Sequence, residues 1–145
     1  FAMTTLQPSL LLRRALFADG LVGVATAAQL LLLADWLSNL LALPGEFLFG
    51  VGIVLIPLVA FLLWLSLRES MARAAVYTVI GLNALWVVLS LLVLLSGWFT
   101  PNLLGYAFVI VQAVVVLVFI ELEWLGLKRS QVIPGAFAQA SVSAQ

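Results

Sequence analysis

The sequence predicts an all-α integral membrane protein in which four transmembrane helices form one bundle. Hydrophobic residues make up 66% of the 145 positions and charged residues only 8%. Six basic and six acidic side chains cannot cover the surface of a soluble domain of this length. The chain also contains four long apolar stretches of about 20 residues or more, each enough for ~30 Å of helix. These two observations together predict a multi-pass helical bundle.

The first span is predicted at residues 15–34, within a membrane domain that covers residues 13–129. Residues 1–12 are short and mixed in composition, and we expect an N-terminal cytoplasmic segment without a fold of its own. After the span, "DWLSNLLAL" places polar side chains on one helical face and Trp and Leu on the other. This pattern predicts an interfacial amphipathic segment between the first and second helices.

The remaining spans are predicted at residues 44–67, 72–95 and 101–127. Pro44 and the pair Thr100–Pro101 are typical of helix starts, and Gly97 is typical of a helix end. Pro57 lies within the second span and is expected to kink it, because proline removes a backbone donor. Residues 130–145 are small, polar and interrupted by Pro-Gly, so we expect a disordered cytoplasmic tail.

The basic residues predict the orientation. With the four spans in place, all of them fall on one side of the membrane: Arg13, Arg14, Arg68, Arg73, Lys128 and Arg129. The positive-inside rule makes that side cytoplasmic, and with it both termini. The stretch "LLRRALFADGLVGVATAA" also has features of a cleaved export signal, but Asp19 interrupts its apolar run, so we favour a retained first span.

Missing residue types exclude most enzyme chemistry. The chain has no His and no Cys, so it offers no imidazole base, no thiolate nucleophile and no disulfide. It contains no phosphate-binding loop and no nucleophile elbow. Basic and acidic residues balance, which gives no basic excess for nucleic acid. We therefore expect a protein that is not an enzyme, with no metal, no cofactor and no nucleic-acid partner.

Polar side chains within the spans are the candidate functional residues, because lipid offers them no hydrogen-bonding partner. Asp19 comes first, since it lies in the cytoplasmic half of the first span. We favour a structural ion pair with Arg14 or Arg73. The alternative is a carboxylate that binds a proton or a cation.

Three further polar residues complete this set. Asn83 and Gln112 are expected near the middle of the membrane, where amides usually join helices by hydrogen bonds. Glu121 is predicted to lie deeper than Glu123 and level with Asp19. The two glutamates are two residues apart, so they point to different helix faces and cannot form one site.

Small residues in the first span predict close helix packing. Gly20, Gly23 and Ala27 provide space for a neighbouring helix, and Gly23 lies one turn from both Asp19 and Ala27. The carboxylate should therefore point into the bundle. Because this span is weakly apolar, we expect its insertion to depend on packing against the other helices.

At "ALFADGLVG" and "VIGLNALWVVLSLLVLLSGW" the chain resembles small four-span bacterial inner-membrane proteins of unassigned function. The resemblance would cover residues 13–129 and rests mostly on composition. It implies a multi-pass protein of the bacterial cytoplasmic membrane, and it assigns no role to any individual residue.

Two classes of function follow. The first is a non-enzymatic membrane protein that acts through helix packing, as a homo-oligomer or as an accessory subunit of a membrane partner, surrounded by membrane lipids. The alternative is a small oligomeric channel or transporter that uses the intramembrane residues Asp19, Asn83, Gln112 and Glu121. Four helices rarely enclose a pore alone, so this alternative requires an oligomer. An enzyme acting on lipid ranks third.

Overall fold

The computed structural model describes residues 5–132, and it is all-α apart from three very short strands. Four of its five helices are long and apolar enough to cross a membrane, as predicted. The elements in chain order are β1 (Thr5–Gln7), α1 (Leu10–Leu32), α2 (Ala34–Leu41), α3 (Gly45–Ser66), β2 (Met71–Ala72), α4 (Arg73–Leu95), α5 (Leu103–Lys128) and β3 (Gln131–Val132).

The first helix begins earlier than the hydropathy pattern predicts. Ser9 is its N-cap, and the side-chain oxygen accepts a hydrogen bond from the Leu12 amide at 3.2 Å. Such a cap satisfies one of the free donors at a helix start. The expectation that residues 1–12 carry no structure is therefore wrong for residues 5–12. Asp19 lies nine residues into the helix, or ~14 Å along its axis.

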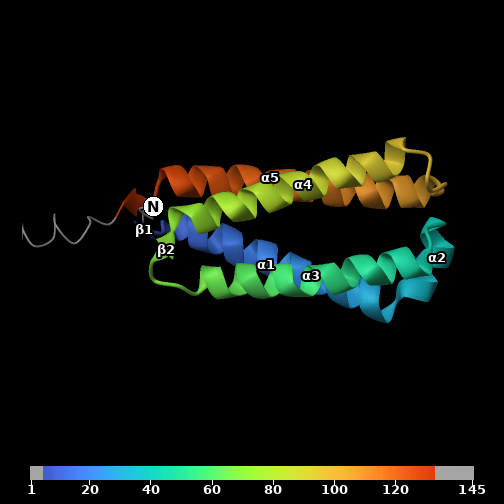
Figure 1. Ribbon diagram of the computed structural model, residues 1–145, viewed down its shortest axis with the longest axis horizontal. Coiled ribbons are helices and arrows are strands. Elements are labelled where there is room, and N and C mark those ends of the chain that lie inside the picture. The colour runs from blue at the N-terminus through green and yellow to red at the C-terminus, as the bar shows by residue number, and fades with distance from the viewer. Residues whose placement is uncertain (1–4, 133–145) are drawn as a thin grey trace, which may run out of the picture.

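A three-stranded antiparallel sheet closes one end of the bundle (Figure 1). β1 is its central strand: Leu6 pairs with Met71 of β2 on one side and with Val132 of β3 on the other. Leu6 and Met71 are buried in the apolar cluster beneath. The sheet ties the start of the chain, the α3–α4 connection and the residues after α5 together. Gln131 and Val132 thus belong to the fold, while the remainder of the expected disordered tail lies outside the described residues.

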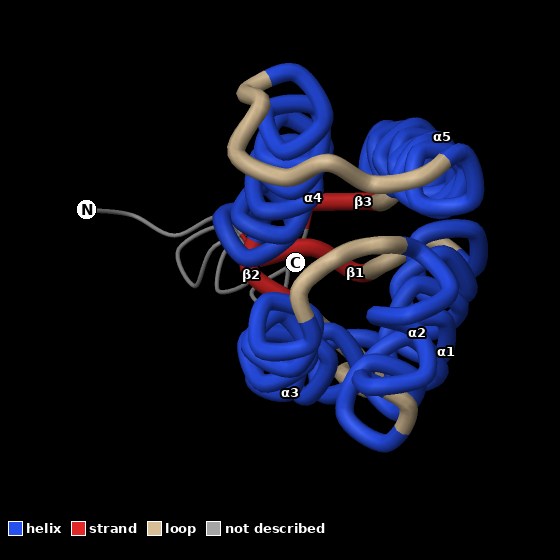
Figure 2. The backbone as a smooth tube through the Cα atoms, turned by 90° about the vertical axis from the view of Figure 1, so that its right-hand side faces the viewer, coloured by secondary structure: helices blue, strands red, loops and turns tan. Residues whose placement is uncertain are grey.

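The four long helices form two pairs, α1 with α3 and α4 with α5 (Figures 1 and 2). The pairs are joined where α1 packs along α5. Apart from side chains near the sheet, α3 and α4 barely touch. Figure 1 shows the two pairs meeting at the sheet and again at the opposite end, where α2 lies close to the start of α5, and lying farther apart between these ends. The bundle is therefore an open arc in the order α3, α1, α5, α4.

Glycines allow the close approach of α1 and α3 within the bundle. A Cβ atom at Gly20 would lie 2.6 Å from the Leu63 side chain, and one at Gly23 would lie 2.6 Å from Val59. Ala27 is buried in the same interface region. The small-residue face of α1, predicted as a packing surface, is thus occupied by α3 of the same chain.

The predicted amphipathic segment is α2, which lies at the end remote from the sheet. Its apolar face buries Leu37 and Leu41. Asn102 joins this helix to α5: its side-chain amide donates to the Leu40 carbonyl at 2.8 Å, and its side-chain oxygen accepts from the Gly105 amide at 2.8 Å. Asn102, and not the predicted Thr100, is therefore the N-cap of α5. Its side chain pairs with a free amide at the start of α5 and with a carbonyl of α2 at the same time.

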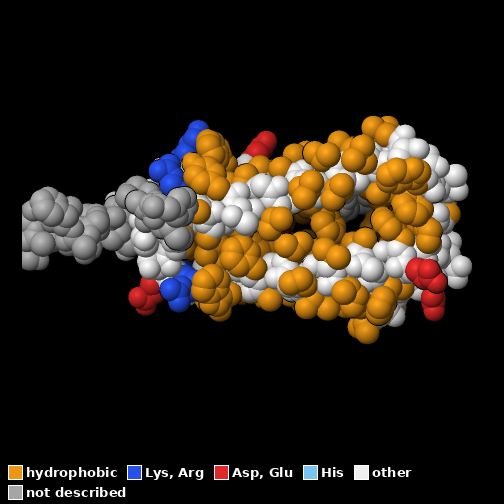
Figure 3. All heavy atoms as spheres, in the orientation of Figure 1, with side chains coloured by type: hydrophobic (Ala, Val, Ile, Leu, Met, Phe, Trp, Pro, Cys, Tyr) orange, Lys and Arg blue, Asp and Glu red, His pale blue; other side chains and the backbone are white. Residues whose placement is uncertain are grey.

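The outer surface of the bundle is apolar along its middle and charged near its ends, as a lipid bilayer requires. Large apolar side chains lie exposed along the whole middle of the molecule, while Lys and Arg gather at the end that carries the sheet (Figure 3). Pro57 is exposed within α3, so the carbonyl that it deprives of a donor lies on the outer side of the bundle. A chain with four such helices and this distribution of charge is a multi-pass membrane protein.

The packing of Gly126 makes the first prediction. Its missing Cβ would lie 2.6 Å from the Leu12 Cα, a backbone atom that cannot move aside cheaply. We expect Gly126→Ala to lower the free energy of unfolding by about 1–3 kcal/mol and the melting temperature by several degrees, as measured by circular dichroism in detergent. The matched control is Gly81→Ala, where the added Cβ meets nothing within 4 Å. Equal melting temperatures for the two variants would contradict this account of the α1–α5 contact.

Candidate functional site

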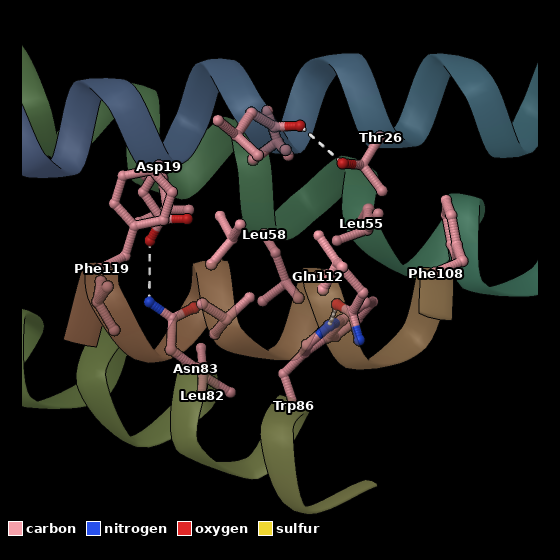
Figure 4. A pocket seen from close by; sticks show the side chains of 18 of the residues that line it. Asp19, Thr26, Leu55, Leu58, Leu82, Asn83, Trp86, Phe108, Gln112 and Phe119 are labelled. Carbon is pink, nitrogen blue, oxygen red and sulfur yellow. Dashed lines mark hydrogen bonds between the residues drawn. The ribbon is translucent and has the colours of Figure 1, made fainter. Parts of the chain in front are cut away.

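Three polar side chains from three helices meet inside the bundle. The side-chain nitrogen of Asn83 on α4 donates one hydrogen bond to Asp19 Oδ2 on α1 at 2.9 Å and one to Glu123 Oε1 on α5 at 3.0 Å. Figure 4 shows the bond between Asn83 and Asp19. An amide nitrogen carries two protons, so both are used here. The carboxyl groups of Asp19 and Glu123 therefore lie close together, because both accept hydrogen bonds from the same nitrogen.

Both carboxyl groups of this triad (Asp19, Asn83 and Glu123) are withdrawn from solvent. Glu123 is 0% exposed and Asp19 is 7% exposed. Within the described part of the chain, Glu123 Oε2 is buried without a hydrogen-bond partner. A buried acceptor without a partner costs free energy, and more so when it carries charge. The triad is therefore incompletely satisfied as it stands.

The predicted ion pair of Asp19 with Arg14 or Arg73 is wrong. Arg14 is exposed, and the Arg73 guanidinium lies 5.8 Å from the centre of the Tyr77 ring. Arg13 Nε is directed to the Ser66 carbonyl at 3.5 Å. The partner of the Asp19 carboxyl is therefore the Asn83 amide and not a cation.

The structure also corrects the choice between the two glutamates. Glu123 is buried beside Asp19, whereas Glu121 is exposed on the outer face of α5. A signal for this was present in the sequence. Glu123 lies three residues before Gly126, which puts both on one helical face, and a glycine there indicates a close neighbouring helix.

Gln112 takes part in a second polar joint, between α4 and α5. Its side-chain oxygen accepts from the Trp86 indole at 2.7 Å, and its nitrogen donates to Ser90 Oγ at 2.9 Å and to the Val109 carbonyl at 3.0 Å. Asn83 and Gln112 both join helices by hydrogen bonds, as the sequence predicts for membrane-embedded amides. In this joint, unlike the triad, the Gln112 amide has partners for both its oxygen and its nitrogen.

A cavity of about 510 Å³ lies between the two helix pairs. Asp19 and Asn83 line it, as do Thr26, Trp86 and Gln112, and the remaining wall is apolar. Figure 4 shows these polar side chains on facing helices across the cavity. The surface in Figure 3 is hollowed between the pairs, where α3 and α4 separate. The cavity thus adjoins one side of the triad, while Glu123 lies behind it.

The acidic pair does not form a conventional metal centre. Within residues 5–132, no group of three or more His, Cys, Asp or Glu side chains could hold a metal ion. The ligands available are two carboxyl groups and one amide oxygen. This set suits a proton or a weakly coordinated cation better than a tightly bound divalent ion.

Comparison with models of known protein families, with curated proteins and with solved structures finds no match. The class of the protein therefore comes from its own fold and site. It is a multi-pass helical membrane protein with a buried carboxyl pair at the wall of an internal cavity.

The triad predicts an energetic coupling between α1 and α4. In a double-mutant cycle of Asp19→Ala and Asn83→Ala, we expect a coupling free energy of about 0.5–2 kcal/mol, because each single variant removes the same hydrogen bond. The measurement is unfolding in mixed micelles by added denaturing detergent. The control cycle combines Asn83→Ala with Glu121→Ala, where the effects should add. A coupling for Asp19 no larger than that for Glu121 would show that the bond contributes nothing to stability.

Proposed function

We propose that this protein is a small, non-enzymatic carrier that binds a cation at the carboxyl pair and moves it across the membrane. One observation carries the proposal: Asp19 and Glu123 are buried together on one amide, and among residues 5–132 no basic side chain pairs with them and one of their oxygens has no partner. Two neighbouring buried carboxylates repel each other, so a proton or another cation must neutralise them.

The cavity supports a carrier better than a pore. A ligand in the cavity would reach Asp19 and Asn83 directly, and an apolar cluster lies toward each end of the bundle. Intramembrane carboxyl groups next to cavities are typical of transport pathways. Movement of the α1–α3 pair against the α4–α5 pair would change access to the site, since α3 and α4 barely touch.

Helix packing remains a second candidate, favoured by the hydrogen bonds of Asn83 to α1 and α5. Under it the protein acts as a homo-oligomer or as an accessory subunit of a membrane partner. The glycine face of α1 weakens this candidate, because α3 of the same chain already covers it. Native mass spectrometry from intact lipid would test it: a stable oligomer or a co-purified protein supports packing.

Cation flux tests the carrier. In proteoliposomes that contain a pH-sensitive dye, we expect proton influx driven by a potassium diffusion potential. Asp19→Asn and Glu123→Gln should lower the rate at least tenfold, because each removes a charge-bearing oxygen from the pair.

The matched control for this assay is Glu121→Gln, two residues along the same helix and exposed. It should keep the rate of the unmodified protein. Wild-type fluxes of protons and of alkylammonium ions no greater than those of empty liposomes would overturn the carrier. Unchanged flux in Glu123→Gln would do the same, and lower stability of that variant with no change in flux would favour packing.

We further propose that the protein resides in the bacterial cytoplasmic membrane with both termini in the cytoplasm. The six basic residues lie at the end of the bundle that carries the sheet, and Asp35 and Glu46 lie near the other end. The positive-inside rule supports this orientation, and the sequence resemblance supports the bacterial setting.

Cysteine labelling tests the orientation, and the absence of native cysteine gives a clean background. In intact cells, a membrane-impermeant maleimide should label Asn39→Cys in α2 and leave Arg129→Cys unlabelled. Lysis should make both reactive. The opposite pattern would place the termini outside and contradict the proposal.

A further inference from the structure

The hydrogen-bond donors on the side chains that line the cavity are all engaged within the protein. Four residues of the cavity wall have polar N–H or O–H groups, and all of these groups already donate within the protein. Thr26 donates to the Val22 carbonyl, and Trp86 donates to Gln112. Both protons of the Gln112 amide are directed to Ser90 and Val109, and both protons of the Asn83 amide are directed to the carboxyl pair. The wall therefore has no side-chain donor left for a ligand.

Acceptors remain at one end of the cavity. Because both protons of Asn83 face the carboxyl groups, its oxygen is left over, and among the described residues no side-chain donor reaches it. Asp19 lies beside it and lines the same cavity. Behind them, Glu123 adds a second carboxyl group with an unpartnered oxygen. A ligand that suits this end must donate hydrogen bonds and carry positive charge.

The rest of the wall selects an apolar body. Apart from the polar residues already named, the lining residues are aliphatic or aromatic, and the rings of Phe108 and Phe119 belong to them. Asp19 and Phe119 both line this cavity (Figure 4). Aromatic faces near a carboxylate attract organic cations in addition to apolar groups. A volume of about 510 Å³ falls within the range of small-molecule sites.

From these observations we propose that the cavity binds a hydrophobic amine, with its ammonium group on Asp19 and Asn83 and its apolar body between the two helix pairs. The inference rests on the proposed function, because it names the cation that the carrier takes. Such a ligand dissolves in the bilayer, and the gap between α3 and α4 faces the bilayer. Entry from the membrane therefore requires no aqueous path.

Three probes with one body and three head groups test the inference: 4-phenylbutylammonium, 4-phenylbutan-1-ol and 4-phenylbutanoate. Binding to the full chain in nanodiscs is measured by equilibrium dialysis against empty nanodiscs, and by quenching of Trp86 fluorescence, with Trp86→Phe to assign the signal. We expect the amine to bind at least tenfold more tightly than the alcohol, and the carboxylate not to bind. Asp19→Asn should weaken amine binding by roughly 10–100-fold, the value of a charge-assisted hydrogen bond.

Two further variants keep the test decisive. Glu121→Gln should bind the amine like the unmodified protein. Leu58→Trp should reduce binding of the amine and of the alcohol alike, because Leu58 lines the cavity from α3 and a larger side chain there fills it. Equal binding of amine and alcohol, or full amine binding by folded Asp19→Asn, would overturn the inference. Proton flux without amine selectivity would overturn the inference and leave the carrier standing. Amine selectivity with neither proton flux nor uptake of 4-phenylbutylammonium into proteoliposomes would support the inference and overturn transport.

Discussion

The amide of Asn83 joins the two halves of the molecule in the middle of the bundle. The side-chain nitrogen of Asn83 donates there to one carboxyl group of each pair, Asp19 on α1 and Glu123 on α5, beside the packing of α1 along α5. A charged group in the membrane interior is costly without a partner, so Asp19 constrains how α1 can rotate and which helices can cover it. The course of α1 between α3 and α5 follows from this requirement, as well as from apolar packing.

The two ends of the bundle are closed by different means. At one end the sheet and the cluster around Leu12 and Leu65 hold the chain together; at the other, α2 and Asn102 do so. Between them the helices do not fill the space, and the cavity remains. A purely structural bundle has no reason to keep both a cavity and an unsatisfied carboxyl group, since each lowers stability. Their coincidence at one place is the physical argument for a binding site.

The hydrogen bonds of the two membrane-embedded amides, Gln112 and Asn83, differ in how completely they are satisfied. Around Gln112 the amide has a partner for its oxygen and its nitrogen, so that joint resembles an ordinary connection between helices. Both protons of the Asn83 amide are already donated, whereas Glu123 Oε2 has no hydrogen-bond partner among the described residues. The same chemical group, a side-chain amide in a transmembrane helix, therefore has a structural role at Gln112 and points to a ligand at Asn83.

The helical class, the four apolar spans and the gathering of basic residues at one end all follow from the amino-acid sequence alone, because the length of an apolar span is set by bilayer thickness and not by the fold. It also singled out Asp19 and Asn83. Three features came to light only in the folded chain: Glu123 and not Glu121 completes the site, no arginine pairs with Asp19 among the described residues, and two- and three-residue strands form a sheet. The reason is geometric: a helix's rotation about its own axis, and pairing between distant short segments, are set by packing among elements, which no local pattern records.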